Sequence, residues 1–199
     1  MKFKRTFPLF CMVILMTLPL MVSPQDQTVK DNEMMKKWQA YSTPGKSHGY
    51  LAAKEGTWEG VVKHWYKPGG EAVVSKALAT NTMILGGRYL KTEHSGELMG
   101  MPINGVNIQC YDNYKKEFAT LWIDDMGTGF YLTHGNLDAS GNVLTEEGLW
   151  DDFLTGKKVK IKTVSTPVSA NSFRFETYAE GPDGQYYRSM EIVYKKKTQ

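Results

Sequence analysis

From Gly56 to the C-terminal end, hydrophobic side chains recur at every second position, and this period of two constrains the fold more than any other feature. Successive residues of a β-strand point to opposite faces of a sheet, so the period predicts strands with one apolar face. Residues 159–164 show it most clearly, because apolar side chains alternate there with lysines. Ten candidate strands follow from the pattern: 58–66, 71–85, 88–98, 103–112, 117–124, 128–137, 143–150, 157–165, 172–179 and 185–195.

The segments between the candidate strands are short and rich in residues that form turns. Short turns join strands that neighbour each other and run antiparallel. A meander of this kind can close on itself and remove both sheet edges, whereas a sandwich usually needs longer connections. We therefore predict an all-β fold, a single antiparallel up-and-down barrel of about ten strands over residues 51–199, in which the first and last strands pair. The turns are expected at 67–70, 86–87, 112–113, 138–141 and 181–184.

The N-terminal segment is typical of a secretory signal peptide. Lys2, Lys4 and Arg5 precede an uncharged run of 16 residues from 7 to 22. As a helix this run would span ~24 Å, short of the ~30 Å hydrocarbon core of a bilayer, so we expect cleavage rather than anchoring. The prediction is a signal peptide over residues 1–24, cut between 22 and 25, and an exported protein that is periplasmic or extracellular.

The charge of the chain is balanced once this segment is removed. The sequence contains 24 basic and 21 acidic residues, and three of the basic residues precede Asp26, the first acidic one. The neutral remainder gives no sign of a surface for nucleic acid. Of the two cysteines only Cys110 would remain, so no intramolecular disulfide is expected and packing must hold the fold together. No membrane span is expected after signal removal, and a homodimer stays open.

Residues 25–50 are expected to form a short N-terminal helix and a lead-in to the barrel. Met34, Met35 and Trp38 share one helical face, which predicts a helix over residues 30–40. Proline and glycine residues follow this segment and break the helical pattern.

Several short motifs carry a resemblance to a known family. Gly56-Thr57-Trp58 is similar to the Gly-x-Trp signature of lipocalins, which implies that Arg188 packs over Trp58 at the closed end of the barrel. A longer series resembles the bacterial domain-of-unknown-function family 1579, whose members are lipocalin-like (calycin-type) barrels. That resemblance covers about residues 51–195 and implies no established reaction. The motifs are GTWEG at Gly56, MILGGRYL at Met83, MGMP at Met99, YDN at Tyr111, WIDDMGTG at Trp122 and DDFLTGKK at Asp151.

The interior of a barrel of eight to ten strands is wide enough for one small ligand. We therefore predict noncatalytic binding of a small hydrophobic or amphipathic molecule inside the barrel. A structural or interaction protein, in which the same side chains fill a solid core, stays open. The candidate ligand-binding residues are Trp58, His64, His94, Trp122, Asp124, Phe130, Phe173, Phe175, Tyr186, Arg188 and Met190.

An enzyme that uses the same cavity is the alternative, with Asp124, His94 or Arg188 as polar participants. The sequence has no nucleophile elbow, phosphate loop, dinucleotide fingerprint or HExxH motif. Asp124 and Asp125 are adjacent, so on a strand they point to opposite faces and do not converge as acid and base. We assign no catalytic residue.

Three histidines lie within candidate strands and raise the question of a metal or haem site. His64, His94 and His134 each carry an imidazole that suits zinc, copper or iron. Their strands are far apart in order, and none of them belongs to a paired metal-ligand spacing. We expect neither metal nor cofactor, and a metal ion or haem on these imidazoles is the weaker alternative.

Overall fold

The structure, a computed structural model, describes residues 24–153 and 155–198. Apart from residue 24, the predicted signal peptide lies outside the described residues. The chain divides between residues 39 and 40 into two units, and the second contains the barrel. Within the described part of the chain, no helix is both long and apolar enough to cross a membrane.

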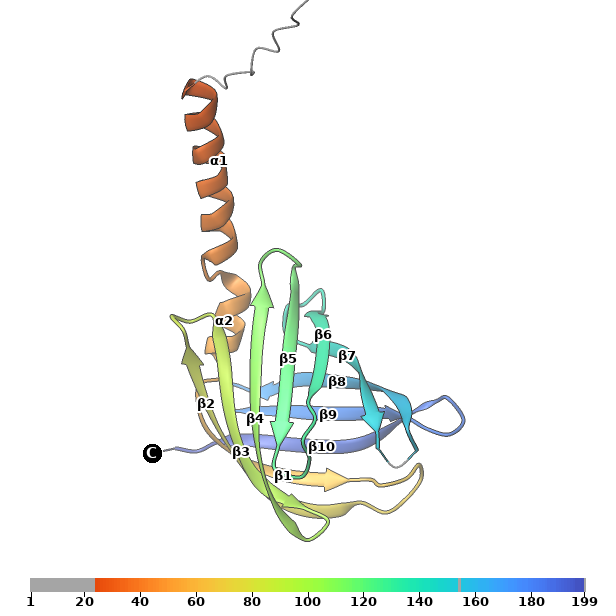
Figure 1. Cartoon of the computed structure of the whole chain (residues 1–199). Coiled ribbons are helices and arrows are strands. Elements are labelled where there is room, and N and C mark those ends of the chain that lie inside the picture. Colours follow the sequence, from red (N-terminus) through yellow and green to blue (C-terminus); the bar gives the residue numbers. More distant parts are fainter. Residues whose placement is uncertain (1–23, 154, 199) are drawn as a thin grey trace, which may run out of the picture. The chain divides into compact units, whose positions relative to one another are not determined.

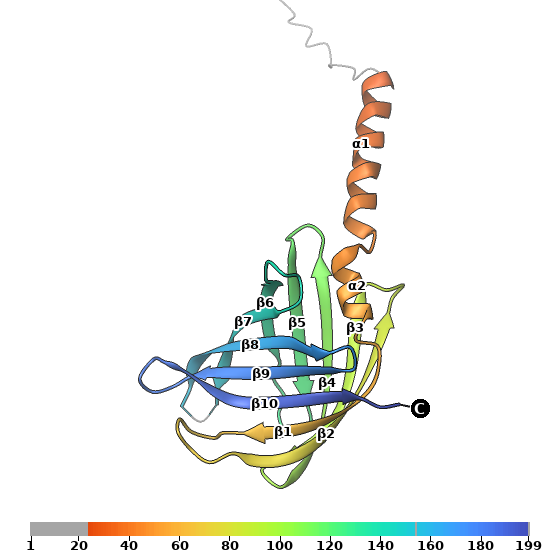
Figure 2. The same cartoon turned by 180° about the vertical axis from the view of Figure 1, so that it is seen from behind.

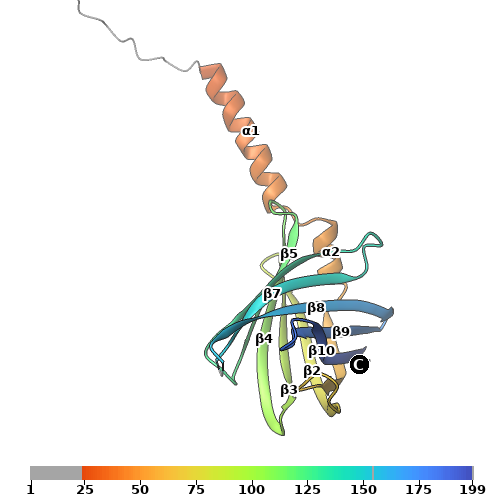
Figure 3. The same cartoon turned by 90° about the vertical axis from the view of Figure 1, so that its right-hand side faces the viewer.

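Ten antiparallel strands form one closed barrel (Figures 1 and 2). Each strand pairs with its neighbours in the chain, and β1 pairs with β10 to close the sheet. The strands on the two sides of the barrel cross each other (Figure 3). This arrangement confirms the predicted up-and-down barrel and its closure. The strands are β1 (Gly56–His64), β2 (Val73–Ile84), β3 (Tyr89–Leu98), β4 (Met101–Asp112), β5 (Glu117–Asp124), β6 (Tyr131–Leu137), β7 (Leu144–Asp152), β8 (Lys157–Ser169), β9 (Ser172–Glu180) and β10 (Tyr186–Lys196).

Two helices precede the barrel. The helix expected over residues 30–40 lies inside α1 (Pro24–Ser42), which extends further at both ends. The second helix, α2 (Lys46–Ala52), was not expected, because Pro44 and Gly45 break the helical pattern. Those residues end one helix and begin another, since the main-chain N–H of Gly45 donates to Nδ1 of His48 at 3.1 Å.

Helix α2 closes one end of the barrel. Its Leu51 is completely buried and packs with Leu90, Phe118 and Leu144. These three partners stand at the beginnings of β3, β5 and β7, so they mark the same end of the sheet. Burial of an aliphatic side chain such as Leu51 contributes about 1.5–3 kcal/mol, which holds the helix against the barrel.

A second apolar cluster covers the inner face where the barrel closes. Trp58, Val62, Ile192 and Tyr194 are buried there, together with alanines of β2. Gly60 allows this packing, because a Cβ atom at that position would lie 2.8 Å from Cγ2 of Ile192. Trp58 therefore faces the barrel interior, as its place among the candidate residues of the interior predicts.

A β-bulge reverses the facing of the first part of β10. Arg188 pairs with Tyr178, whereas Met190 pairs with Thr177, so Ser189 is the extra residue. Arg188 and Tyr186 consequently share the outer face with Tyr178, and the prediction that they point inward is wrong. The sequence pattern does not reveal the bulge, because side chains on both sides of it are large and mixed in polarity.

The predicted packing of Arg188 over Trp58 is also wrong. The Arg188 guanidinium carbon lies 4.5 Å from the centre of the Trp65 ring on the outer face. Lys196, which pairs with Trp58 across the closing strands, places its Nζ atom 5.4 Å from the centre of the Trp58 ring. The cation over the signature tryptophan is therefore a lysine.

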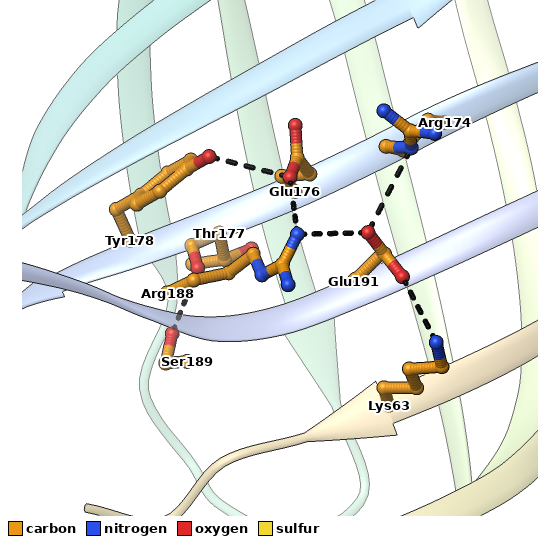
Figure 4. Close-up of polar contacts among 8 residues, drawn as sticks. All are labelled: Lys63, Arg174, Glu176, Thr177, Tyr178, Arg188, Ser189 and Glu191. Atoms are coloured by element: carbon orange, nitrogen blue, oxygen red, sulfur yellow. Dashed lines mark hydrogen bonds and ion pairs between the residues drawn. The ribbon is translucent and has the colours of Figure 1, made fainter. Parts of the chain in front are cut away.

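An ion-pair network ties the closing strands together on the outside (Figure 4). Arg188 Nη1 lies 2.9 Å from Oε2 of Glu191 and 3.0 Å from Oε1 of Glu176. Lys63 and Arg174 approach the two oxygens of Glu191 at 3.7 Å each. The network joins β1, β9 and β10, and it keeps Glu191 only 9% exposed although this residue faces outward.

Candidate functional site

Solvent reaches inward-facing side chains in the middle of the barrel. Thr120, Trp122, Thr163 and Phe175 all face the interior and are only partly buried. The two clusters of fully buried apolar residues, at the closing strands and beneath α2, remain separate. A solid core would join these clusters and bury the side chains between them. The pattern of burial therefore indicates a lumen between the two clusters.

A chain of polar and aromatic side chains crosses one side of this lumen. The indole Nε1 of Trp122 donates to Oδ2 of Asp124 at 2.7 Å. The Trp122 ring meets the His94 ring edge to face at 5.6 Å, and the Tyr194 hydroxyl lies 3.3 Å from Nδ1 of His94. Burial lowers the pKa of His94, so its imidazole is neutral at neutral pH and its Nδ1 can accept a hydrogen bond from the Tyr194 hydroxyl. Trp122, Asp124 and His94, three of the predicted ligand-binding residues, thus lie together in one group.

Further aromatic side chains extend this wall. Tyr131 pairs with Trp122 across β5 and β6, and its ring meets that of Trp150 at 5.9 Å. Burial raises the pKa of the Tyr131 hydroxyl, and the nearby Asp124 carboxylate raises it further. On the opposite side, Phe173 contacts Trp58 with ring centres 4.9 Å apart. The wall is apolar with a few oriented polar atoms, as ligand pockets usually are.

A buried carboxyl group lies nearer to the end that α2 closes. Glu146 is 3% exposed and faces inward from β7. Its Oε1 accepts a hydrogen bond of 2.7 Å from Thr120 Oγ1, and its Oε2 accepts one of 3.1 Å from Gln109 Nε2. Burial raises the pKa of Glu146 to about 7, while the Thr120 hydrogen bond and the charge of Lys54 act against this shift.

Lys54 enters the same region from the turn between α2 and β1. Its Nζ atom lies 3.3 Å from Ser165 Oγ and 4.5 Å from the centre of the Tyr50 ring. Burial lowers the pKa of Lys54 to about 8, and the charge of Glu146 opposes the change. An ammonium group at the end of an apolar lumen is costly unless something pairs with it.

Sequence reasoning missed both of these charged groups. Lys54 lies outside every candidate strand, so alternation assigns it no direction. Glu146 is followed by Glu147, and either of the two fits the charged outer face of a half-buried strand. The available signal was the shared parity of Glu146 with Leu144 and Trp150, which are two apolar residues of the same strand.

The predicted ligand-binding residues lie at three kinds of position: on the inner wall, on the outer face, and before the start of a strand. His64 faces the lumen beside Met190, stacks on Tyr66 with ring centres 5.8 Å apart, and has its pKa lowered by burial. Phe130 is 65% exposed and precedes β6, so its predicted place on the inner wall is wrong. The inner wall carries Trp58, His64, His94, Trp122, Asp124, Phe173, Phe175 and Met190, whereas Tyr186 and Arg188 lie on the outer face. Ligand binding by these residues stays a prediction.

The three histidines considered for a metal do not meet. His64 and His94 face the lumen, whereas His134 faces outward and its Nδ1 lies 3.3 Å from Oε1 of Glu117. Among the residues that the structure describes, no group of three or more His, Cys, Asp or Glu side chains is placed to hold a metal ion.

An open groove of about 510 Å³ lies along strands β2 to β5. Asn104 and Asp125 line part of it, and Asp125 accepts hydrogen bonds of 2.9 Å from both the main chain and the side chain of Asn104. Most of its lining residues have outward parity, but His94 and Asp124 of the inner wall line it as well.

Comparison with known proteins finds one family model and several solved structures of similar fold. The family model described as "Protein of unknown function (DUF1579)" matches residues 43–196. No curated protein matches the sequence significantly. Among solved structures, the S-type phycobiliprotein lyase CPES from Guillardia theta is similar with a TM-score of 0.54 and 5% identity, over 82% of this chain and 97% of that chain. Rv2717c from M. tuberculosis is similar with a TM-score of 0.56 and 10% identity, over 78% of this chain and 100% of that chain. At these identities the similarity shows the fold alone.

Proposed function

We propose that this chain, which belongs to the DUF1579 family of proteins of unknown function, binds a small apolar or amphipathic molecule in the lumen of its barrel. One observation carries the proposal: inward-facing aromatic side chains of a closed barrel, Trp122, Tyr131 and Trp150, remain accessible to solvent. An apolar molecule that covers these rings removes them from water at about 25 cal/mol per Å² of apolar surface. The polar atoms of Asp124 and His94 would orient it.

Native mass spectrometry of the protein purified from its own host tests the proposal directly. A bound compound that organic solvent extracts, and that is lipid-like or aromatic, is the expected result. A protein that is empty in repeated preparations and that also fails to take up an apolar fluorescent probe would overturn it.

A matched pair of variants locates the bound molecule. Thr163 on β8 faces the lumen opposite Glu146, whereas Thr166 on the same strand faces outward beside Arg174. We expect Thr163→Trp to fill the lumen and to weaken binding of 1-anilinonaphthalene-8-sulfonate at least tenfold. Thr166→Trp should leave binding unchanged. Equal binding by two variants with native-like unfolding midpoints would exclude the lumen as the site.

We also propose that the protein is exported, on the basis of the charged and then apolar N-terminal segment. N-terminal sequencing of the protein recovered from host fractions is the test. A new N-terminus between residues 22 and 25 in the periplasmic or culture fraction is expected, and an intact N-terminus in the cytoplasmic fraction would refute export.

A further inference from the structure

Lys54 and Glu146 bring opposite charges to the closed end of the lumen without contacting each other. Their charges interact, yet no ion pair joins them among the described residues. The ammonium lies over the Tyr50 ring and 5.8 Å from the centre of the Phe173 ring. Because the two groups form no ion pair with each other, the Lys54 ammonium keeps hydrogen atoms that a polar group of another molecule can accept.

The hydrogen bonds on Glu146 show what this other molecule would need to offer. Both carboxyl oxygens already accept a hydrogen bond, one from Thr120 and one from Gln109. Gln109 Nε2 also donates to Thr120 Oγ1 at 2.8 Å, so the three side chains hold one another in place. A protonated Glu146 therefore has an O–H group to donate.

The ammonium of Lys54 also has hydrogen atoms to donate. A lysine ammonium has three donors, and within the described part of the chain Ser165 Oγ is the acceptor that the Lys54 ammonium has. The closed end of the lumen thus supplies donors from Lys54 and from protonated Glu146, with a single formal positive charge. A group with two acceptor oxygens and one negative charge complements this arrangement.

We propose that Lys54 and Glu146 bind the carboxylate head group of an apolar carboxylic acid, whose hydrocarbon part lies along the aromatic wall toward Trp122. The carboxylate oxygens accept hydrogen bonds from the Lys54 ammonium and from the Glu146 hydroxyl, and such charge-assisted hydrogen bonds are the stronger kind. This inference rests on the proposed function, because it names the class of molecule that the lumen binds.

Protonation makes the site sensitive to pH near neutrality. With a pKa of about 7, Glu146 is protonated in about half of the molecules at neutral pH, and Lys54, with a pKa of about 8, is still mostly charged. The other titratable groups that sense the charge of Glu146 are Tyr50, whose pKa is raised to about 12, and Cys110, whose pKa is also raised by burial. Both stay neutral, so affinity for the acid should fall as the pH rises from 6 to 8.5.

Calorimetric titration with dodecanoic acid and with dodecan-1-ol tests the head group, because the two probes share one hydrocarbon chain. We expect the acid to bind at least tenfold more tightly than the alcohol at pH 6, with the preference decreasing toward pH 8.5. Lys54→Met should abolish the preference and Lys54→Arg should retain most of it. Glu146→Gln should keep a donor for the carboxylate and reduce the pH dependence of the preference to the part that Lys54 contributes. Lys160→Met and Glu147→Gln, which change residues outside the lumen, are the matched controls.

The outcomes separate the two proposals. Equal affinity of acid and alcohol, or a preference that survives Lys54→Met, overturns the head-group assignment and leaves lumen binding intact. Failure of both probes and of the naphthalene dye to bind overturns both proposals. Unfolding midpoints of all variants are measured in parallel, and the decrease of the preference between pH 6 and pH 8.5 carries the test if Lys54→Met does not fold.

Discussion

The indole Nε1 of Trp58 donates a hydrogen bond of 2.8 Å to the main-chain carbonyl oxygen of Lys54. Asn81 Nδ2 donates to the same oxygen, also at 2.8 Å. The signature tryptophan therefore fixes the turn between α2 and β1 as well as packing in the inner cluster. Because Lys54 extends its side chain into the lumen from this turn, the hydrogen bond from Trp58 helps to position the ammonium.

Replacement of Trp58 by phenylalanine tests this relationship. Trp58→Phe keeps an aromatic ring against Phe173 but removes the N–H donor, and the loss of one buried hydrogen bond should lower the free energy of unfolding by about 0.5–1.5 kcal/mol. The phenylalanine ring also buries less apolar surface than the indole, which lowers the free energy of unfolding further. Affinity for dodecanoic acid should fall as well, because the Lys54 carbonyl oxygen then keeps the hydrogen bond from Asn81 but loses the one from the indole. Urea denaturation and calorimetry measure the two effects, and Trp65→Phe on the outer face is the control for binding. Unaltered acid affinity in Trp58→Phe would show that the tryptophan does not position Lys54.

The raised pKa of Glu146 predicts how stability depends on pH. The pKa moves from 4.5 in the unfolded chain to about 7 in the folded protein, so between these values the folded state holds the additional proton. The free energy of unfolding should therefore decrease as the pH rises through this window, by up to about 3 kcal/mol. Glu146→Gln cannot ionise and should remove this part of the decrease. Urea denaturation at several pH values measures it.

Glu147→Gln is the matched control for that experiment, because Glu147 is exposed and belongs to the same strand. It should leave the slope of stability against pH unchanged. An identical slope in the wild type and in Glu146→Gln would show that the buried carboxyl group titrates normally.

Much of the barrel was accessible to sequence reasoning because alternation is a local property. Residues that favour turns mark where each strand begins and ends. Gly86 and Gly87 are an example, because both have positive φ angles, which other residues adopt only with an unfavourable conformational energy. The closure of the barrel could be predicted because short turns join the strands in chain order, so the first and last strands are left to pair. On β1, the parity of Trp58 and Val62 gave the correct inner face, since nothing interrupts that strand.

The errors arise where the structure departs from regular alternation. The bulge at Ser189 turns Arg188 outward, and its energy depends on tertiary partners such as Glu176 that no local pattern identifies. Phe130 was assigned to a strand that begins one residue later. Lys54 lies outside the strands and reaches the lumen only because α2 and Trp58 hold its turn. Contacts between distant segments decide all three cases.

The ion-pair network predicts that Arg188 stabilises the closing strands and takes no part in ligand binding. Arg188→Met leaves Glu176 and Glu191 without their closest cation, although their side chains are only 12% and 11% exposed. Leaving shielded carboxylates unpaired should cost about 1–3 kcal/mol, whereas the exposed pair of Lys158 and Asp151 should contribute less than about 1 kcal/mol. Urea denaturation of Arg188→Met and Lys158→Met measures the contrast. A loss of dye binding in a folded Arg188→Met protein would contradict the outward placement.

The close packing of β6 against β7 predicts that Gly135 cannot be replaced without displacing Glu146. A Cβ atom at Gly135 would collide with the main-chain oxygen of Thr145 and lie 2.6 Å from Cα of Glu146. Backbone atoms cannot move aside as a flexible side chain can, so Gly135→Ala should force the strands apart at a cost of about 1–3 kcal/mol or more. Gly127→Ala is the matched control, because a Cβ atom there meets nothing within 4 Å, and it should change stability by less than about 0.5 kcal/mol. Thermal unfolding measures both variants, and dodecanoic acid binding should weaken in Gly135→Ala alone. If the two alanine variants unfold at the same temperature and bind the acid equally, the contact between β6 and β7 is looser than described and Glu146 is not held by it.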